Sequence, residues 1–137
     1  MKKLYLALIL PCVLSSFSAL AEQSGLQPQT QGDVTFVSGG VGIDEQNTLR
    51  AMQSDYNLSV LFSVQGTGEY LSDVKVTITD TSGNVYLDTV ADGPKLFVNL
   101  KAGRYIVTAN QDGRVVRKTA TVGGKHRTSL SFTWPQG

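Results

Sequence analysis

The sequence contains few of the residues on which metal and covalent chemistry depend. It has one cysteine, one histidine and one tryptophan among 137 residues. Cys12 lies in the apolar run near the N-terminus, so the rest of the chain has no thiolate ligand and no disulfide. His126 stands between Lys125 and Arg127, and two adjacent cations disfavour a metal ion at its ring. We therefore expect no metal site, no cofactor and no enzymatic activity.

A surplus of charge of either sign is also missing. Twelve Lys and Arg residues stand against 11 Asp and Glu residues. A general nucleic-acid-binding protein needs a basic excess to neutralise phosphates, so we expect no nucleic-acid partner. The length fits one globular domain and excludes a multidomain enzyme.

The N-terminus has the pattern of an export signal. Two lysines precede apolar residues from Leu4 to Leu14, and Ala19-Leu20-Ala21 has the small-x-small pattern of a cleavage site. The run is about 11 residues long, whereas a membrane span needs about 20. We expect a signal peptide over residues 1–21, cleaved near Ala21, and a mature chain without a transmembrane segment. Its expected location is the periplasm, with secretion as the alternative.

Residues 22–33 are rich in Gln, Ser, Gly and Pro, and Leu26 is their single large apolar residue. Such a segment buries too little apolar surface to offset its loss of chain entropy. We therefore expect a flexible leader over residues 22–33. The folded domain is expected over residues 34–137, with order beginning near Val34.

Alternation of apolar and polar residues dominates the chain after Asn57. In the clearest case, Val74, Val76 and Ile78 alternate with polar residues, as in a strand with one buried face. The expected strands are 58–64, 73–79, 85–90, 96–100, 104–110, 114–122 and 129–134. Turn sequences separate them, and Gly123-Gly124 is expected to form the last hairpin. This spacing predicts an all-β, seven-stranded antiparallel sandwich.

Residues 39–56 do not follow that alternation. Asp44 can cap a short helix that continues through Leu49 and Met52, because its carboxylate can accept the free amide protons of the first turn. So short a helix needs the sandwich to support it, and we expect it across one end or one edge of the sheets. The Gly-Gly-Val-Gly segment at 39–42 favours a bulge or a bend over a phosphate-binding loop.

The segment from Leu100 to Ala109 combines a leucine, a glycine turn and a Tyr-x-Val-x-Ala strand, and Asp112-Gly113 follows it. With the Val-x-Val strand at 74–78, it resembles the carboxypeptidase regulatory-like domain family, whose fold is a prealbumin-like (transthyretin-like) seven-stranded sandwich. The resemblance covers residues 57–134. It implies an exported bacterial accessory module with a stabilising or interaction role and without catalysis.

Two residues of this segment have specific expected roles. Gly103 can take a positive φ, which would let the chain enter the next strand from a tight turn. Tyr105 is expected to bury its ring between the sheets. Its hydroxyl is expected to return to the backbone near the turn, as in the tyrosine corner of other sandwiches.

Five cations on the last two expected strands and the loop between them form the first candidate partner-binding surface. They are Arg114, Arg117, Lys118, Lys125 and Arg127. Gathered on one edge or end, they could bind an acidic partner, a lipid headgroup or an anionic glycan. The alternative is an edge strand that its charges protect against aggregation. Because Arg117 and Lys118 are neighbours, they face opposite sides of the sheet, which weakens the interpretation as a single patch.

Tyr86 and Phe97 form the second candidate surface. Both are out of phase with the apolar residues beside them, so both are expected to face away from the main core. Left uncovered, they would form an aromatic strip suited to a protein partner or to stacking on a sugar. The alternative is that the short helix covers them.

The sequence thus predicts a non-catalytic accessory or protein-interaction module of the cell envelope, with an envelope or secreted protein as its partner. The alternative is a carbohydrate or small-molecule binding protein that uses the aromatic strip. A small hydrolase is the third possibility. Some prealbumin-like relatives hydrolyse small ring compounds, but their sites need several His and Arg residues and a Tyr-Arg-Gly-Ser-like C-terminus, whereas this chain ends with Trp-Pro-Gln-Gly.

Overall fold

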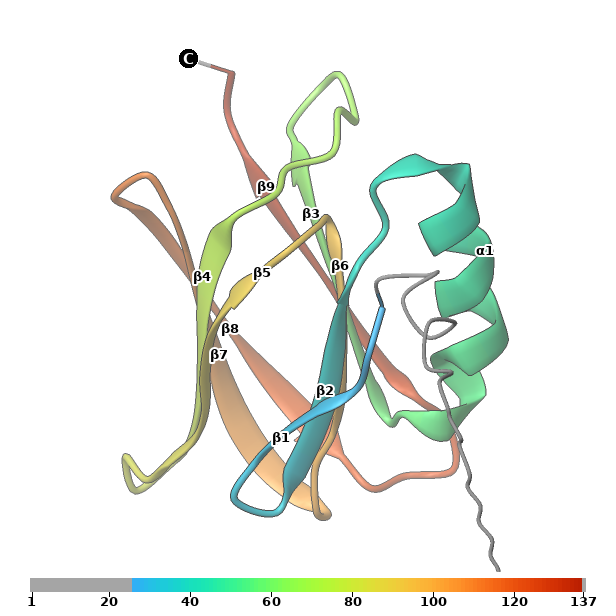
Figure 1. Ribbon diagram of the computed structural model, residues 1–137. Helices are drawn as coiled ribbons and strands as arrows, with labels where there is room; N and C mark the ends of the chain where they lie inside the picture. Colours follow the sequence, from blue (N-terminus) through green and yellow to red (C-terminus); the bar gives the residue numbers. More distant parts are fainter. Residues whose placement is uncertain (1–25, 137) are drawn as a thin grey trace, which may run out of the picture.

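The computed structural model describes residues 26–136 (Figure 1). Within this range, nine strands form two sheets, and α1 (Gly42–Met52) and the short 3-10 turn η2 (Gln53–Asp55) connect β2 to β3. The predicted signal peptide, residues 1–21, lies outside the described residues. None of the helices between residues 26 and 136 has the length and apolar character required to cross a membrane.

The larger sheet contains five strands in the order β1-β2-β6-β3-β9. They are β1 (Gln29–Gln31), β2 (Val34–Gly39), β6 (Lys95–Asn99), β3 (Leu58–Val64) and β9 (Thr128–Trp134). All neighbours in this sheet are antiparallel except β3 and β9, which run parallel. The prediction of an entirely antiparallel sandwich is wrong at this pair, because β9 enters the sheet from the opposite layer and not through a hairpin.

The smaller sheet contains four antiparallel strands in the order β5-β4-β7-β8. They are β4 (Val74–Asp80), β5 (Val85–Ala91), β7 (Gly103–Gln111) and β8 (Arg114–Val122). Its two hairpins are those that the sequence predicts, and both residues of the Asp112-Gly113 turn have positive φ, as such tight turns require. The Gly123-Gly124 segment is not the predicted hairpin, because it carries the chain from β8 to β9 in the other sheet.

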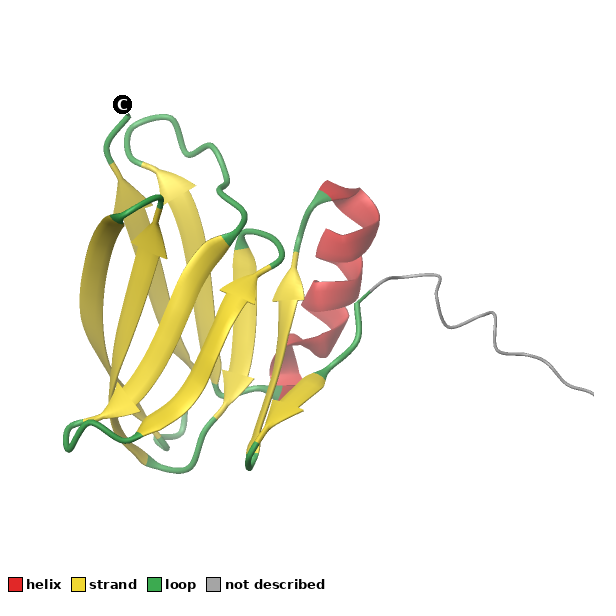
Figure 2. Ribbon diagram, turned by 60° about the vertical axis from the view of Figure 1, so that its left-hand side comes forward, coloured by secondary structure: helices red, strands yellow, loops and turns green. Residues whose placement is uncertain are grey.

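The main core lies between the two sheets and follows the predicted alternation (Figure 2). Val74, Val76 and Ile78 are fully buried. The largest fully buried side chains of this core are Trp134, Phe36, Phe62 and Phe132. All seven predicted strands are present to within a residue or two at their ends, and β1 and β2 precede them to give nine.

A second apolar cluster lies on the outer side of the five-stranded sheet, beneath α1 (Figure 2). Its buried residues are Leu26, Val37, Leu49, Tyr56 and Phe97. The helix therefore covers a face of the sheet, whereas the sequence predicted a position at an end or an edge. Because Leu26 is buried here and β1 pairs with β2, ordered structure begins before Val34, within the segment predicted as a flexible leader.

The N-terminus of α1 is stabilised by Glu45 and not by Asp44. The N-cap residue is Val41, and within the described part of the chain its side chain makes no capping hydrogen bond. Instead, Glu45 Oε1 accepts hydrogen bonds from the backbone N–H groups of Gly40 and Val41, each at 3.1 Å. The predicted cap is thus wrong by one residue, since an acid inside the first turn reaches back to the preceding amides, as in a capping box.

Side chains join the two sheets along both open sides of the sandwich. On one side, Gln31 Nε2 donates to the Asp88 carbonyl at 2.9 Å, and Gln31 Oε1 accepts from the Asp88 N–H at 3.0 Å. On the other side, Lys118 Nζ donates to the Ser131 carbonyl at 2.5 Å. These bonds occupy backbone groups of edge strands that could otherwise pair with another chain.

Candidate ligand-binding pocket

A pocket of about 480 Å³ opens at the end of the sandwich that lies lowest in Figure 1. The turns β1–β2, β4–β5 and β6–β7 meet at this end. The pocket is lined by residues 31–34, by Val85 and Tyr86, by residues 99–102 and by Tyr105. We call it the tyrosine pocket, because two tyrosine rings form its aromatic wall.

The aromatic wall consists of Tyr86 and Tyr105, whose ring centroids are 5.4 Å apart and whose planes are nearly perpendicular. Tyr105 is buried, whereas 38% of Tyr86 is exposed. The pairing of β4 with β5 shifts between Ile78 and Thr79, which leaves Tyr86 as an extra residue. Such a bulge redirects a side chain. Here it brings the Tyr86 ring against the ring of Tyr105, which belongs to the main core.

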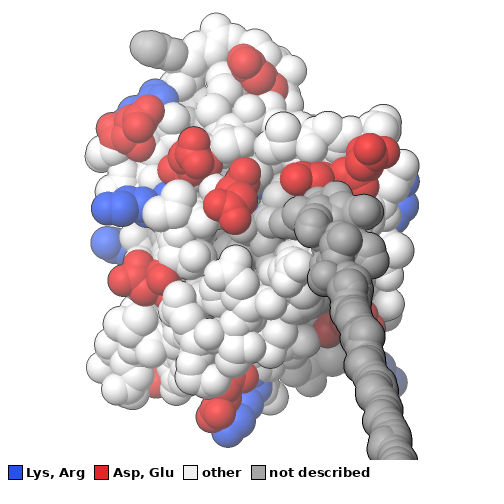
Figure 3. Space-filling view, in the orientation of Figure 1, with Lys and Arg blue, Asp and Glu red and all other residues white. Residues whose placement is uncertain are grey.

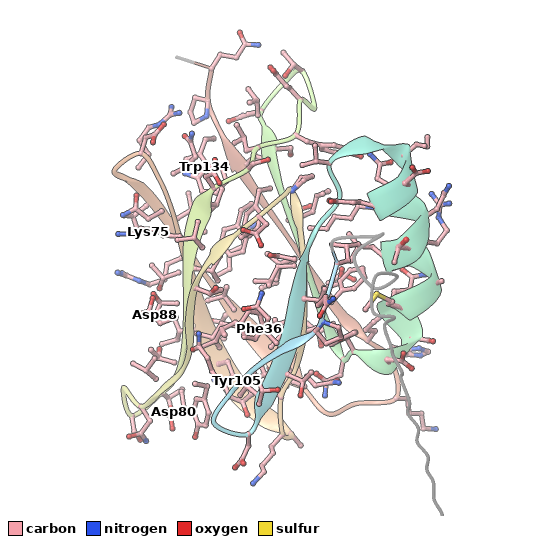
Figure 4. All side chains as sticks on the ribbon, viewed as in Figure 1. Phe36, Lys75, Asp80, Asp88, Tyr105 and Trp134 are labelled. Carbon is pink, nitrogen blue, oxygen red and sulfur yellow. The ribbon has the colours of Figure 1, made fainter. Side chains whose placement is uncertain are left out.

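Both phenol groups of the tyrosine pocket donate hydrogen bonds to acceptors within the protein. Tyr105 Oη donates to the Lys101 carbonyl at 2.7 Å, which confirms the predicted return of its hydroxyl to the backbone. Tyr86 Oη donates to Asp80 Oδ2 at 3.1 Å. Asp80 and Tyr105 lie close together at this end of the molecule (Figure 4).

These contacts shift the ionisation of all three groups. Hydrogen bonds from Asn84, and then from Ser82 and Tyr86, hold the pKa of the Asp80 carboxyl below its usual range. The hydrogen bond to Asp80 raises the pKa of Tyr86. Burial, followed by the negative charge of Asp80, raises the pKa of Tyr105. Both phenols therefore stay protonated near neutral pH and act as fixed donors.

The wall formed by residues 99–102 is held in place by Asn57. The Asn57 side chain donates from Nδ2 to the Leu100 carbonyl at 2.7 Å and accepts at Oδ1 from the Leu100 N–H at 3.0 Å. Asn99 Oδ1 in turn accepts from the Asn57 N–H at 3.0 Å. The exposed side chains of Asp33 and Lys101 complete the polar lining of the pocket.

Gly103 does not have the predicted positive φ. It is the first residue of β7, paired with Val122, and a Cβ there would meet the Tyr105 ring at an ordinary 3.7 Å. The glycine that this region requires is Gly123, with φ +113°, where a Cβ would lie 2.5 Å from the Ala102 Cβ. A larger residue at position 123 would therefore be strained and would also clash with the pocket wall.

The five predicted cations do not form one patch. Arg114 lies at the opposite end of the molecule from the tyrosine pocket, where it donates to the Pro135 carbonyl at 3.0 Å. Lys118 joins the two sheets, and its ammonium also lies 5.6 Å from the centroid of the Phe132 ring. Arg117 lies exposed on β8. On the face drawn in Figure 3, acidic side chains are spread across the middle and basic ones lie near the margins.

Lys125 and Arg127 lie together at the pocket end of the molecule. With His126 they line a second, shallower hollow of about 350 Å³, which we call the basic hollow. Its other lining residues are Ser54, Tyr56, Asn57 and Gly124. The Arg127 guanidinium donates to the Gln53 carbonyl at 2.8 Å, which fixes the basic loop against η2.

The aromatic strip suggested for Tyr86 and Phe97 does not form. The two residues lie in different sheets. Phe97 is only 4% exposed and packs against Tyr56 beneath α1, with the ring centroids 6.0 Å apart. Of the two alternatives, coverage by the helix holds for Phe97, and Tyr86 belongs to the tyrosine pocket instead.

The sequence did not predict the tyrosine pocket, because its walls come from segments that are distant in the chain. Asn57 holds the wall of residues 99–102 in place and stands just before a predicted strand. Its hydrogen-bond partner, Leu100, lies 43 positions later in the chain. The pairing shift in β5 leaves no distinctive residue type in the sequence. Among residues 26–136, no group of three or more His, Cys, Asp or Glu side chains could hold a metal ion.

These features define a two-sheet β-sandwich with a pocket at one end. No protein-family model matches the sequence, and no curated protein matches it significantly. Among solved structures, the chain is similar to the 5-hydroxyisourate hydrolase of Klebsiella pneumoniae, with 23% sequence identity and a TM-score of 0.47. The match covers 58% of this chain and 90% of that one.

Proposed function

We propose that this protein is a non-catalytic binding module of the cell envelope, of the carboxypeptidase regulatory-like type, that holds a small polar ligand or a sugar ring in the tyrosine pocket. The aromatic wall of Tyr86 and Tyr105 carries the proposal. Small-molecule sites have volumes of about 300–1,000 Å³ and combine apolar or aromatic walls with a few polar groups. The tyrosine pocket, at about 480 Å³, has this combination of walls, with Asp33, Asn99 and Lys101 as polar groups.

The state of the two phenol groups supports a binding role over a catalytic one. A general base needs a pKa near the working pH. Both tyrosines have a pKa above the ordinary 10.0, and both hydroxyls already donate to protein acceptors. They are therefore suited to fixing the shape of a site and presenting aromatic surface. The envelope location in this proposal rests on the predicted export signal.

A small ligand is favoured over a protein partner held by the five cations. Arg114 and Lys118 hold carbonyls of the same chain, at positions away from the tyrosine pocket. The five cations therefore do not offer one common surface to a protein partner. The pocket, by contrast, has a partly exposed ring in Tyr86, which offers a surface for stacking.

The test is ligand-dependent thermal stabilisation of the purified protein by a panel of mono- and disaccharides and small polar ring compounds. We expect at least one compound to raise the melting temperature with a saturable concentration dependence. Tyr86→Ala should weaken this ligand about tenfold, through loss of the aromatic contact. Tyr70→Ala is the matched control, because Tyr70 is 50% exposed and lies outside the pocket lining.

Two outcomes would contradict the proposal. One is that no compound of the panel stabilises the protein. The other is that Tyr86→Ala binds the stabilising compound as tightly as Tyr70→Ala does, which would place the ligand elsewhere.

A further inference from the structure

The tyrosine pocket and the basic hollow are neighbours that share one wall. Asn57 lines the basic hollow, and it exchanges two hydrogen bonds with Leu100, which lines the tyrosine pocket. The loop that carries the basic residues begins at Gly123, directly against Ala102 of the same wall. The two hollows thus adjoin across residues 99–102, so only a ligand longer than one ring could occupy both.

The two hollows differ in charge. The basic hollow is lined by three consecutive residues of the basic loop, among them the cations Lys125 and Arg127 on either side of His126. Of the described residues, none that lines the basic hollow carries a carboxylate, and Asp55 is the acidic residue that immediately neighbours them in sequence. The lining of the tyrosine pocket includes the carboxylate of Asp33 and, in the wall of residues 99–102, the cation Lys101.

We propose that the ligand is an acidic oligosaccharide that spans both hollows. This inference rests on the proposed function and assigns a ligand class to the same site. An uncharged face of one sugar ring stacks on Tyr86, and the carboxylate of a neighbouring uronic acid lies in the basic hollow, within reach of Lys125 and Arg127. The difference in lining charge sets this direction, because the tyrosine pocket has one cation, Lys101, and one carboxylate, Asp33, whereas Lys125 and Arg127 both line the basic hollow.

The strand edge beside the pocket favours a saccharide over an acidic peptide. Extended peptides commonly bind by adding a strand to a free sheet edge. At the β5 edge beside the pocket, the Gln31 amide already binds both the N–H and the carbonyl of Asp88, so an added strand could not pair with this residue. What remains for a ligand is an aromatic ring with side-chain amides, a carboxylate and cations, which suits a ligand dense in hydroxyl groups.

The experiment compares acidic oligosaccharides with neutral forms of the same sugars. Isothermal titration calorimetry on the purified protein uses tetramers of galacturonic acid and of mannuronic acid, each as the free acid and as the methyl ester. We expect at least one free acid to bind at least tenfold more tightly than its ester. This preference should shrink as the salt concentration rises.

Two double variants test whether the preference for the free acid depends on the basic hollow. Lys125→Ala with Arg127→Gln should reduce the affinity for the acid to that for the ester and leave the ester unchanged. Arg50→Ala with Lys75→Ala is the matched control, because it removes the same net charge from α1 and from β4. That control should keep the preference for the acid. Circular dichroism confirms that each variant is folded.

The outcomes separate this inference from the proposed function. Equal binding of acid and ester, still dependent on Tyr86, overturns the acidic class and leaves the proposed function standing. Binding of hexaglutamate in place of any uronate overturns the saccharide class. If no tetramer binds, the inference is overturned, and the panel of neutral compounds decides the proposed function separately.

Discussion

The core between the sheets and the cluster beneath α1 are built in different ways. Within residues 26–136, the main core has 20 buried residues, which come from every strand except β1 and include Leu100 just after β6. The α1 cluster has five, and only Val37 and Phe97 among them come from strands. Adjacent residues of β2, Phe36 and Val37, face the two clusters in turn. One sheet thus contributes to two apolar interiors, one on each of its faces.

The largest expected effect is that of a charge placed in the main core. Val76→Asp should unfold the whole domain, because an unpaired buried carboxylate costs several kcal/mol against a total stability of roughly 5–15 kcal/mol. Val76 is fully buried. The measurement is thermal unfolding followed by circular dichroism.

Lys75→Asp serves as the control for this substitution, because Lys75 is an exposed neighbour on the same strand. It should change the stability by less than about 1 kcal/mol. A Val76→Asp variant that melts within a few degrees of wild type would show that the sandwich does not depend on this core.

A smaller and more local effect is expected from the α1 cluster. Leu49→Ala should cost about 2–5 kcal/mol of the stability of α1, because Leu49 is the fully buried residue of the helix. In hydrogen exchange, the α1 amides should exchange faster, while the amides of β4 and β7 stay close to wild type. Ile43→Ala, at a position that is 70% exposed on the same helix, should change neither.

The same exchange experiment shows whether the two clusters unfold independently. If Leu49→Ala speeds exchange in β4 and β7 as much as in α1, the two clusters unfold together. The helix would then be part of one cooperative unit and not a separate cover on the sheet.

The contrast between the clusters also explains what the sequence could predict. Alternation identified the inward face of β4 and the other strands of the main core, because a half-buried strand has a period of two. It also placed Phe97 correctly on the outward face. It could not say that α1 covers that face, since the partners of Phe97 include Leu26 in the N-terminal segment and Tyr56 after the helix.

The tyrosine pocket was harder to predict for a related reason. A register shift of one residue, between Ile78 and Thr79, decides which way Tyr86 points. Period-two reasoning assumes an unbroken register, so a bulge defeats it. The parallel pairing of β3 with β9 was missed because strand order in a sandwich depends on long-range packing, which alternation does not encode.

The smallest expected effect concerns the attachment of α1 at its N-terminus. Glu45→Ala removes the acceptor of the Gly40 and Val41 N–H groups, so it should cost about 0.5–2 kcal/mol, as for other N-terminal caps. Asp44→Ala is the matched control, because it removes the same charge from the same helical turn, and its side chain does not cap the helix. Chemical denaturation measures both variants. Equal losses would assign the effect to the helix dipole. A larger loss for Glu45→Ala means that the two hydrogen bonds from the Gly40 and Val41 N–H groups to the Glu45 carboxylate join α1 to the end of β2 and so keep the helix on the sheet.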